Sequence, residues 1–123
     1  MAKILVAEPE AFFSKFYSVK FKKEGYEVDR ETDGRKVYEN LNKNLYDLLL
    51  INLMLPYKDG FTILRDLKNT PNKDIPVIVI TELKQEQDCK KAENLGVKHY
   101  FVKNEDQIGE ILRVVKEEVG KKK

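Results

Sequence analysis

Four short apolar runs, each followed by a polar residue, constrain the fold more than any other feature of this sequence. The polar residues are Glu8, Asn52, Thr81 and Lys103. The runs before them are Ile4–Ala7, Leu48–Ile51, Val77–Ile80 and Tyr100–Val102. Such runs, rich in Val, Ile and Leu without alternation, are typical of strands buried on both faces of a parallel sheet. Because the carboxyl ends of parallel strands open on one edge, we expect the four polar side chains to share one crevice.

Segments with apolar residues at helical spacing separate these strands. They lie around residues 13–21, 37–41, 61–67, 85–95 and 108–119. A further strand, Tyr26–Arg30, follows Gly25, and Thr32 or Asp33 is predicted to cap the second helix. Five strands alternating with five helices predict a doubly wound α/β fold, a three-layer (βα)5 sandwich around a parallel five-stranded sheet. In the flavodoxin-like strand order 2-1-3-4-5, Glu8 and Asn52 would border the crevice.

Composition excludes several classes of function. The 23 basic and 21 acidic residues leave a net charge of +2, too small to attract nucleic acid or anionic lipid strongly. We see no apolar run long enough to span a bilayer and no signal peptide. With a single cysteine, Cys89, a cytoplasmic location is the simplest expectation.

Several spaced motifs occur in an order that resembles the bacterial response-regulator receiver domain, of the CheY-like type, in two-component signal transduction. They are Lys3–Glu8, Tyr46–Pro56, Asp59-Gly60, Ile75–Thr81 and Gly96–Lys103. The resemblance covers the whole chain. It implies one receiver domain over residues 1–120, a basic tail over 121–123 and no effector domain.

The resemblance also implies a reaction in which an aspartate after the third strand accepts a phosphoryl group, usually from a phosphohistidine of a kinase. Asn52 occupies that position. A carboxamide has no anionic oxygen and its nitrogen lone pair is delocalised, so it cannot act as the nucleophile. We therefore expect no conventional aspartyl phosphorylation and no enzymatic activity.

The acidic pair that holds magnesium in the family corresponds to Glu8 and Pro9 here. Proline has no side-chain ligand atom, which leaves Glu8, Asn52 and the Met54 carbonyl as a vestigial set. Magnesium requires near-octahedral oxygen coordination. We expect no cofactor, and weak or absent magnesium binding.

Thr81, Tyr100 and Lys103 match the positions that contact the phosphoryl group or reorient on activation in the family. The alternative, which we favour, is that Thr81 caps a strand and Lys103 neutralises Glu8, since a buried lysine is costly unless paired. Glu82 stands where the family usually has a small residue, and it is predicted to obstruct the pocket. A solvated glutamate is favoured over one that reaches Lys103 and mimics a phosphoryl charge.

Asn104 replaces the proline that follows the family lysine, whose peptide bond is characteristically cis. A cis bond before a residue other than proline costs about 2.5–4 kcal/mol. We therefore expect a trans bond, a helix cap at Asn104, and a displaced Lys103.

These features predict a degenerate receiver, a pseudo-receiver, that acts through protein contacts. The expected partner face comprises the fourth helix, fifth strand and fifth helix, with no nucleic acid or membrane partner, and the chain would be a monomer or a weak homodimer. The alternative is a phosphoacceptor in a phosphorelay that uses another carboxylate, or a receiver with an engineered Asn52. A flavin-type ligand is disfavoured, because Glu8-Pro9-Glu10 would repel phosphate.

Overall fold

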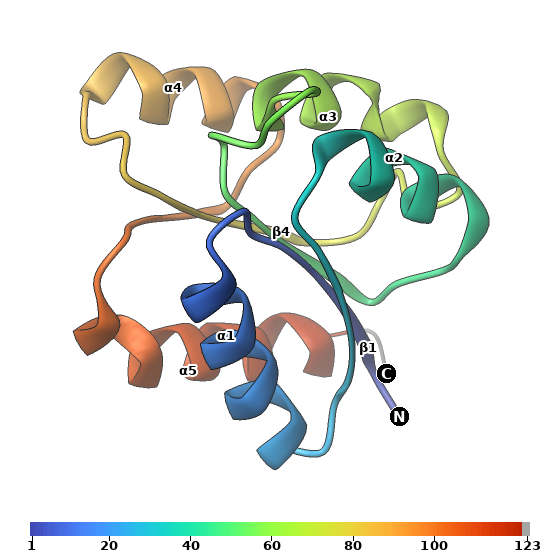
Figure 1. Ribbon diagram of the computed structural model, residues 1–123, viewed down its shortest axis with the longest axis vertical. Coiled ribbons are helices and arrows are strands. Elements are labelled where there is room, and N and C mark those ends of the chain that lie inside the picture. Colours follow the sequence, from blue (N-terminus) through green and yellow to red (C-terminus); the bar gives the residue numbers. More distant parts are fainter. Residues whose placement is uncertain (122–123) are drawn as a thin grey trace.

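The computed structural model describes residues 1–121, in which five strands alternate with five α-helices (Figure 1). The strands are β1 (Lys3–Ala7), β2 (Glu27–Glu31), β3 (Leu48–Ile51), β4 (Val77–Thr81) and β5 (His99–Val102). The α-helices are α1 (Ala11–Lys23), α2 (Gly34–Lys43), α3 (Gly60–Asp66), α4 (Glu86–Asn94) and α5 (Ile108–Gly120). A 3₁₀ turn, η1 (Leu67–Asn69), follows α3, and a second one, η2 (Glu105–Gln107), precedes α5.

The sheet is parallel throughout and has the order β2-β1-β3-β4-β5, which confirms the predicted doubly wound α/β fold. Helices α1 and α5 cover one face, and α2, α3 and α4 cover the other (Figure 1). Ala7 pairs in register with Ile51, so Glu8 and Asn52 leave the sheet at the same level. The backbone N–H of Lys103 likewise donates to the Thr81 carbonyl at 2.8 Å. The register therefore brings the polar residues after the strands to one edge.

The core consists of two apolar clusters, one on each side of the sheet. One includes Val37 and Ile63, and the other includes Tyr17, Phe21 and Ile111. The central strands β1, β3 and β4 are almost wholly buried, as their unbroken apolar runs predict, whereas the edge strands β2 and β5 are partly exposed.

The second strand begins one residue later than the sequence predicts. The backbone N–H of Tyr26 donates to the Phe21 carbonyl at 3.2 Å and so still belongs to the end of α1. Glu27 makes the first contact with the neighbouring strand, through a hydrogen bond to the Ala2 carbonyl. The shift arises because the turn at Gly25, where φ is +92°, uses Tyr26 to close the helix.

Two of the capping predictions are confirmed. Asp33, not Thr32, caps α2 by accepting a hydrogen bond from the backbone N–H of Arg35 at 2.8 Å. Asn104 accepts one from the backbone N–H of Asp106 at 2.9 Å, and no peptide bond among residues 1–121 is cis. The cap at Asn104 starts η2, so α5 begins only at Ile108.

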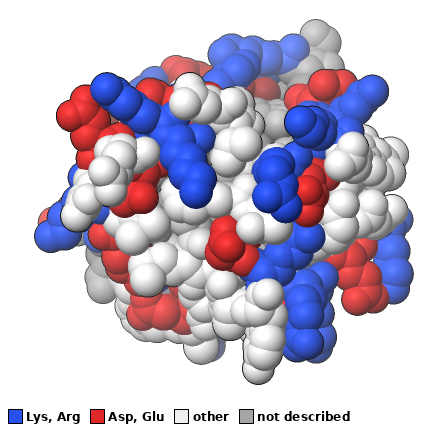
Figure 2. Space-filling model, turned by 90° about the horizontal axis from the view of Figure 1, so that it is seen from above, with Lys and Arg blue, Asp and Glu red and all other residues white. Residues whose placement is uncertain are grey.

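Charged side chains of both signs are interspersed on the face over α2, α3 and α4 (Figure 2). Of the predicted basic tail, Lys121 lies 3.4 Å from Glu118, and Lys122 and Lys123 lie outside the described residues. Within residues 1–121, we find no helix with the length and apolar content needed to cross a bilayer.

Candidate functional site

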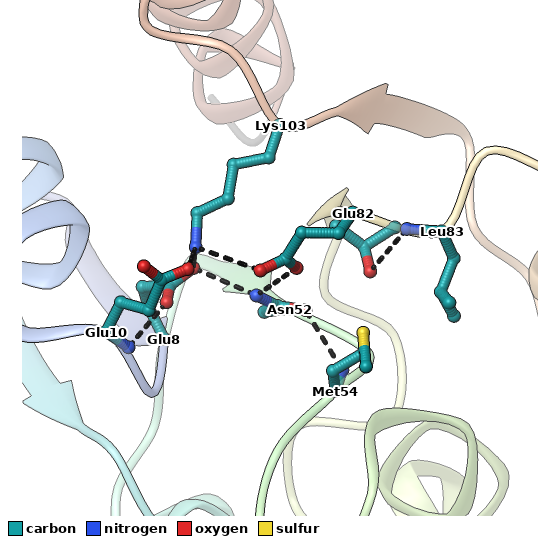
Figure 3. Close-up of polar contacts among 8 residues, drawn as sticks. Glu8, Glu10, Asn52, Met54, Glu82, Leu83 and Lys103 are labelled. Atoms are coloured by element: carbon teal, nitrogen blue, oxygen red, sulfur yellow. Dashed lines mark hydrogen bonds and ion pairs between the residues drawn. The ribbon is translucent and has the colours of Figure 1, made fainter.

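The carboxyl edge of the sheet carries a compact polar cluster made from four separate segments of the chain (Figure 3). Glu8 and Glu10 follow β1, Asn52 follows β3, Glu82 follows β4, and Lys103 follows β5. Lys103 extends from the β5 end towards the carboxylates, and Asn52 lies between Glu8 and Glu82. The predicted convergence is therefore present for Glu8, Asn52 and Lys103, whereas the Thr81 hydroxyl contacts the backbone N–H of Leu83.

Lys103 is the central cation of this cluster. Its Nζ lies 2.9 Å from Glu8 Oε1, 2.6 Å from Glu10 Oε1 and 3.7 Å from Glu82 Oε2. Its side chain is 4% exposed. Burial by itself would lower the Lys103 pKa, but the hydrogen bonds to Glu10 and Glu8 and the nearby negative charges raise it above the ordinary value for lysine. The ammonium is therefore held charged in a site that is nearly closed to water.

Asn52 uses its whole amide group within the protein. Its Nδ2 donates to Glu8 Oε1 and to Glu82 Oε1, each at 3.1 Å, and its Oδ1 accepts from the backbone N–H of Met54 at 2.9 Å. An amide nitrogen donates two hydrogen bonds and an amide oxygen accepts, so this arrangement satisfies the group. Buried Asn52 thus joins two carboxylates that would otherwise repel one another.

Glu8 is almost inaccessible and both of its oxygens have partners. Oε1 accepts from Asn52 and Lys103, and Oε2 accepts from the backbone N–H of Glu10 at 2.7 Å. Pro9, between the two glutamates, contributes no side-chain ligand atom. The prediction that Lys103 neutralises Glu8 is confirmed, whereas the predicted displacement of Lys103 is wrong, because Asn104 caps η2 without pulling the lysine from the crevice.

Glu82 lies over the crevice, although the sequence favoured a solvated side chain. It accepts from Asn52 and approaches Lys103 while remaining about half exposed. Burial would raise its pKa, but hydrogen bonds from its own backbone N–H and from Asn52, together with the Lys103 charge, lower it. The expectation of a solvated carboxylate is therefore wrong, because the Asn52 amide and the Lys103 ammonium attract it.

Thr81 and Tyr100 meet at Leu83, the second residue of the loop after β4. The buried Thr81 hydroxyl oxygen accepts from the backbone N–H of Leu83 at 3.4 Å, and the Tyr100 hydroxyl donates to the Leu83 carbonyl at 2.8 Å. Tyr100 also packs against the core beneath α4. Burial raises the pKa of Tyr100 to about 12, so its hydroxyl is a donor at neutral pH.

Three residues contact Lys103 or Tyr100 although no such contact was predicted for them from the sequence. Glu10 makes the shortest contact with Lys103, the Phe13 ring centroid lies 4.3 Å from Lys103 Nζ, and Leu83 supplies the backbone acceptor for Tyr100. Glu10 had a sequence signal, since it lies only three residues beyond β1. Phe13 and Leu83 had none, because one is an ordinary helix residue and the other acts through its backbone.

Comparison with known proteins identifies the same fold and family. A family model described as "Response regulator receiver domain" matches residues 4–116. The chain is 36% identical over 103 residues to Response regulator ArlR of Staphylococcus saprophyticus, covering 84% of this chain and 46% of that protein. The chain therefore spans less than half the length of this relative.

Solved structures agree with the family match. The Francisella response regulator 1452 receiver domain shares 27% identity with the chain over the full length of both, with a TM-score of 0.87. The receiver domain of a sensor histidine kinase from Pseudomonas aeruginosa, solved with a magnesium ion in its active site cleft, is 22% identical with a TM-score of 0.86, and the match covers 97% of this chain and 98% of that one. Receiver domains are generally signalling domains rather than enzymes. The chain belongs to the response regulator receiver domain family of two-component signalling.

Proposed function

We propose that this receiver signals through protein contacts without phosphorylation at the acceptor position. The observation that carries the proposal is the Asn52 amide, bound between the Glu8 and Glu82 carboxylates by hydrogen bonds of 3.1 Å. A nucleophile for phosphoryl transfer needs an available electron pair on an oxygen or nitrogen. The Asn52 nitrogen is delocalised into its carbonyl and donates both hydrogens, so it offers none.

The residues present do not fit magnesium. The two Glu8 oxygens and the Asn52 oxygen already accept hydrogen bonds, and Pro9 supplies no ligand. The Lys103 ammonium lies 2.9 Å from the one buried carboxylate that could bind a metal. A second cation beside it would be repelled, and magnesium gives up its water reluctantly. We expect weak or absent magnesium binding.

The charge around Lys103 also disfavours an incoming phosphoryl group. Three carboxylates lie within 3.7 Å of its Nζ, so the cation is already neutralised. Glu82 reaches Asn52 and Lys103 from the mouth of the crevice, where a phosphoryl donor would have to enter. An anionic donor would meet net negative charge there.

The partner face proposed for this receiver comprises α4, β5 and α5. Helix α4 buries only Ala92 among its described residues, and β5 is an edge strand in which Val102 is partly exposed. The Tyr100 hydrogen bond to Leu83 fixes the loop between β4 and α4 against β5. This hydrogen bond supports a partner face whose arrangement does not depend on a change in the crevice.

The proposal is tested by treating the protein with magnesium and acetyl phosphate, and separately with beryllium fluoride, while intact mass and backbone amide shifts are recorded. The matched variant combines Pro9→Asp, Asn52→Asp and Glu82→Ala, which supplies an acidic pair and an acceptor and removes the obstructing carboxylate. A reference receiver that accepts phosphate shows that the reagents work.

The expected result is no adduct and no shift in the native protein. A phosphoryl adduct on the native protein, mapped to any residue of the crevice, would overturn the proposal and favour a phosphorelay acceptor. Shifts at Thr81, Tyr100 and Lys103 with beryllium fluoride would overturn it equally, because they would show that the crevice still binds a phosphoryl surrogate.

A further inference from the structure

A groove runs between α3 and α4 and continues to the amino-terminal edge of the sheet. It consists of three adjoining hollows of about 310, 320 and 310 Å³, whose walls come from residues 59–68, 73–76, 91–98 and 118–121. The first and second hollows share Arg65, Asn94 and Leu95, and the second and third share Lys73 and Gly96. Because each hollow shares wall residues with the next, together they form one elongated depression, here called the α3–α4 groove.

The floor of the α3–α4 groove is apolar and rests on the core. Leu64 and Leu67 are buried, and Phe61, Ile75 and Leu95 are partly buried against the same core cluster. Close packing against the core holds these side chains in place. Apolar side chains of a ligand that entered the hollows would therefore meet a largely preformed surface.

The charged residues in the walls of the groove are mainly basic. Two of the three acidic ones have partners within the chain. Asp59 accepts from the backbone N–H of Thr62 at 2.9 Å, and Glu118 accepts from His99 at 2.9 Å, whereas Asp74 is exposed. The lining contains six basic residues: Arg65, Lys68, Lys73, Lys91, Lys98 and Lys121.

Four lysines of the groove have charges that the chain itself does not neutralise. None of the ion pairs found within residues 1–121 involves Lys68, Lys73, Lys91 or Lys98, and all four residues are exposed. Lys91 Nζ lies 4.4 Å from the Phe61 ring centroid, which places a positive charge over the apolar floor. Unpaired cations along an apolar groove complement a partner in which carboxylates alternate with apolar side chains.

We propose that the α3–α4 groove binds an acidic protein segment in an extended conformation, with apolar side chains in the hollows and carboxylates on the lysines. The charges are distributed over all three hollows, which suits a chain that lies along the groove. None of the lining residues belongs to the polar cluster around Lys103. The inference therefore goes beyond the proposed function and does not depend on it.

Two other ligands fit the groove less well. A nucleic acid carries a negative phosphate at every nucleotide, so Asp59, Asp74 and Glu118 would repel parts of its backbone. A single small anion is held by donors that converge on one point. The unpaired lysines do not converge in this way, because Lys91 lines the first hollow and Lys98 lines the third.

The test uses a synthetic peptide of Asp-Leu-Glu-Pro repeats, whose prolines prevent a helix, and two twins. The basic twin has lysine at every acidic position, and the polar twin has serine at every leucine. Binding to the full chain is followed by backbone amide shifts and by the dissociation constant. We expect saturable binding of the acidic peptide with shifts centred on residues 59–68, 73–76 and 91–98. The polar twin should bind at least about tenfold more weakly, and the basic twin should not bind.

Charge-reversal variants separate binding in the α3–α4 groove from general electrostatic attraction. The double variant Lys73→Glu, Lys91→Glu should weaken the acidic peptide at least about tenfold, because two of the unpaired cations become anions. The matched variant Lys22→Glu, Lys23→Glu makes the same change in net charge on α1, on the other face of the sheet, and should change the affinity less than about twofold. Amide shifts outside the substituted segments report that each variant is folded.

Binding that is unsaturable, equal affinity for the acidic peptide and the polar twin, or equal losses in the two double variants would overturn the proposal. Two further measurements address the other ligands. If the chain fails to bind the acidic peptide but binds single-stranded DNA in a manner that depends on Lys73 and Lys91, the groove is a nucleic-acid site. If inorganic diphosphate gives saturable shifts in the groove and the acidic peptide gives none, it is a small-anion site, and in either case the proposal is wrong.

Discussion

The Nζ of Lys103 lies 2.9 Å from Glu8 Oε1, and the two side chains are only 4% and 3% exposed. Removing one partner of such a pair leaves a charge in a site that excludes water. We expect Lys103→Met to lower the free energy of unfolding by about 3–5 kcal/mol at neutral pH.

Urea denaturation measures this loss. Adding Glu8→Gln to Lys103→Met should restore much of the lost free energy of unfolding, because the buried side chain at position 8 is then neutral. Lys43→Met, which breaks the exposed pair with Glu39, should have no measurable effect, and an equal loss in both lysine variants would contradict the interpretation.

Tyr100 makes stability depend on pH at the alkaline end. Burial raises its pKa to about 12, above the ordinary value of 10, so the unfolded chain loses this proton first as the pH rises. Stability from this group is fully present below pH 10 and is lost between about pH 10 and 12. Tyr100→Phe should flatten that part of the urea stability curve. Tyr46, whose pKa is also raised by burial, remains as a common background in both proteins.

Glu118 makes stability depend on pH at the acid end. Its hydrogen bond to His99 at 2.9 Å, opposed by burial, lowers the pKa of this nearly buried carboxyl. As the pH falls, the Glu118 carboxylate of the unfolded chain therefore takes up a proton before that of the folded protein does. The contribution of Glu118 to the free energy of unfolding is present above pH 4.5 and is lost as the pH falls through the lowered pKa. Glu118→Gln should be less stable at neutral pH and less sensitive to acid. Thermal unfolding between pH 7 and pH 3 compares the two, and parallel curves would contradict this role.

Asn72 fixes the segment between α2 and β3. Its buried amide accepts from the backbone N–H of Tyr46 at 2.8 Å and donates to the Leu41 and Asn44 carbonyls, each at 2.7 Å. Asn72→Ala would leave these backbone groups unsatisfied, and we expect a loss of about 2–4 kcal/mol in urea denaturation. Asn69→Ala, at an exposed position nearby, should have little effect.

Gly34 and Gly109 should respond in opposite directions to alanine. A Cβ atom at Gly34 would lie 1.8 Å from the Lys58 carbonyl oxygen, a backbone atom that cannot move without displacing the loop after β3. We expect Gly34→Ala to cost about 2 kcal/mol or more. Gly109 lies in α5 with nothing within 4 Å, so Gly109→Ala should stabilise by about 0.5–1 kcal/mol. Thermal denaturation of both variants tests the contrast.

The sequence predicted the fold because its strongest signals are local. Unbroken apolar runs such as Leu48–Ile51 are typical of strands buried on both faces, and parallel order then brings Glu8, Asn52 and Lys103 to one edge. The sequence did not predict the one-residue shift of β2. Tyr26 is apolar enough for a strand, but its backbone N–H closes the preceding helix.

The direction of flexible polar side chains could not be predicted in the same way. Glu82 follows a strand, and nothing in the local sequence distinguishes a solvated glutamate from one attracted inward. Its position depends on Asn52, thirty residues away in the sequence, which supplies the donor at 3.1 Å. The hydrogen bond from Tyr100 to Leu83 could not be predicted for a related reason. Its acceptor is a backbone carbonyl, which every residue type has.

The position of the Asn52 amide between two carboxylates affects which substitutions this crevice can accept. Asn52 donates to Glu8 and Glu82, so an aspartate gained at this position alone would place three neighbouring carboxylates in contact, with a single lysine to balance them. Replacement of Glu82 by a neutral residue reduces that repulsion, because only the contact with Glu8 then remains. An acidic side chain at position 52 is therefore accommodated more easily after the Glu82 carboxylate has been replaced.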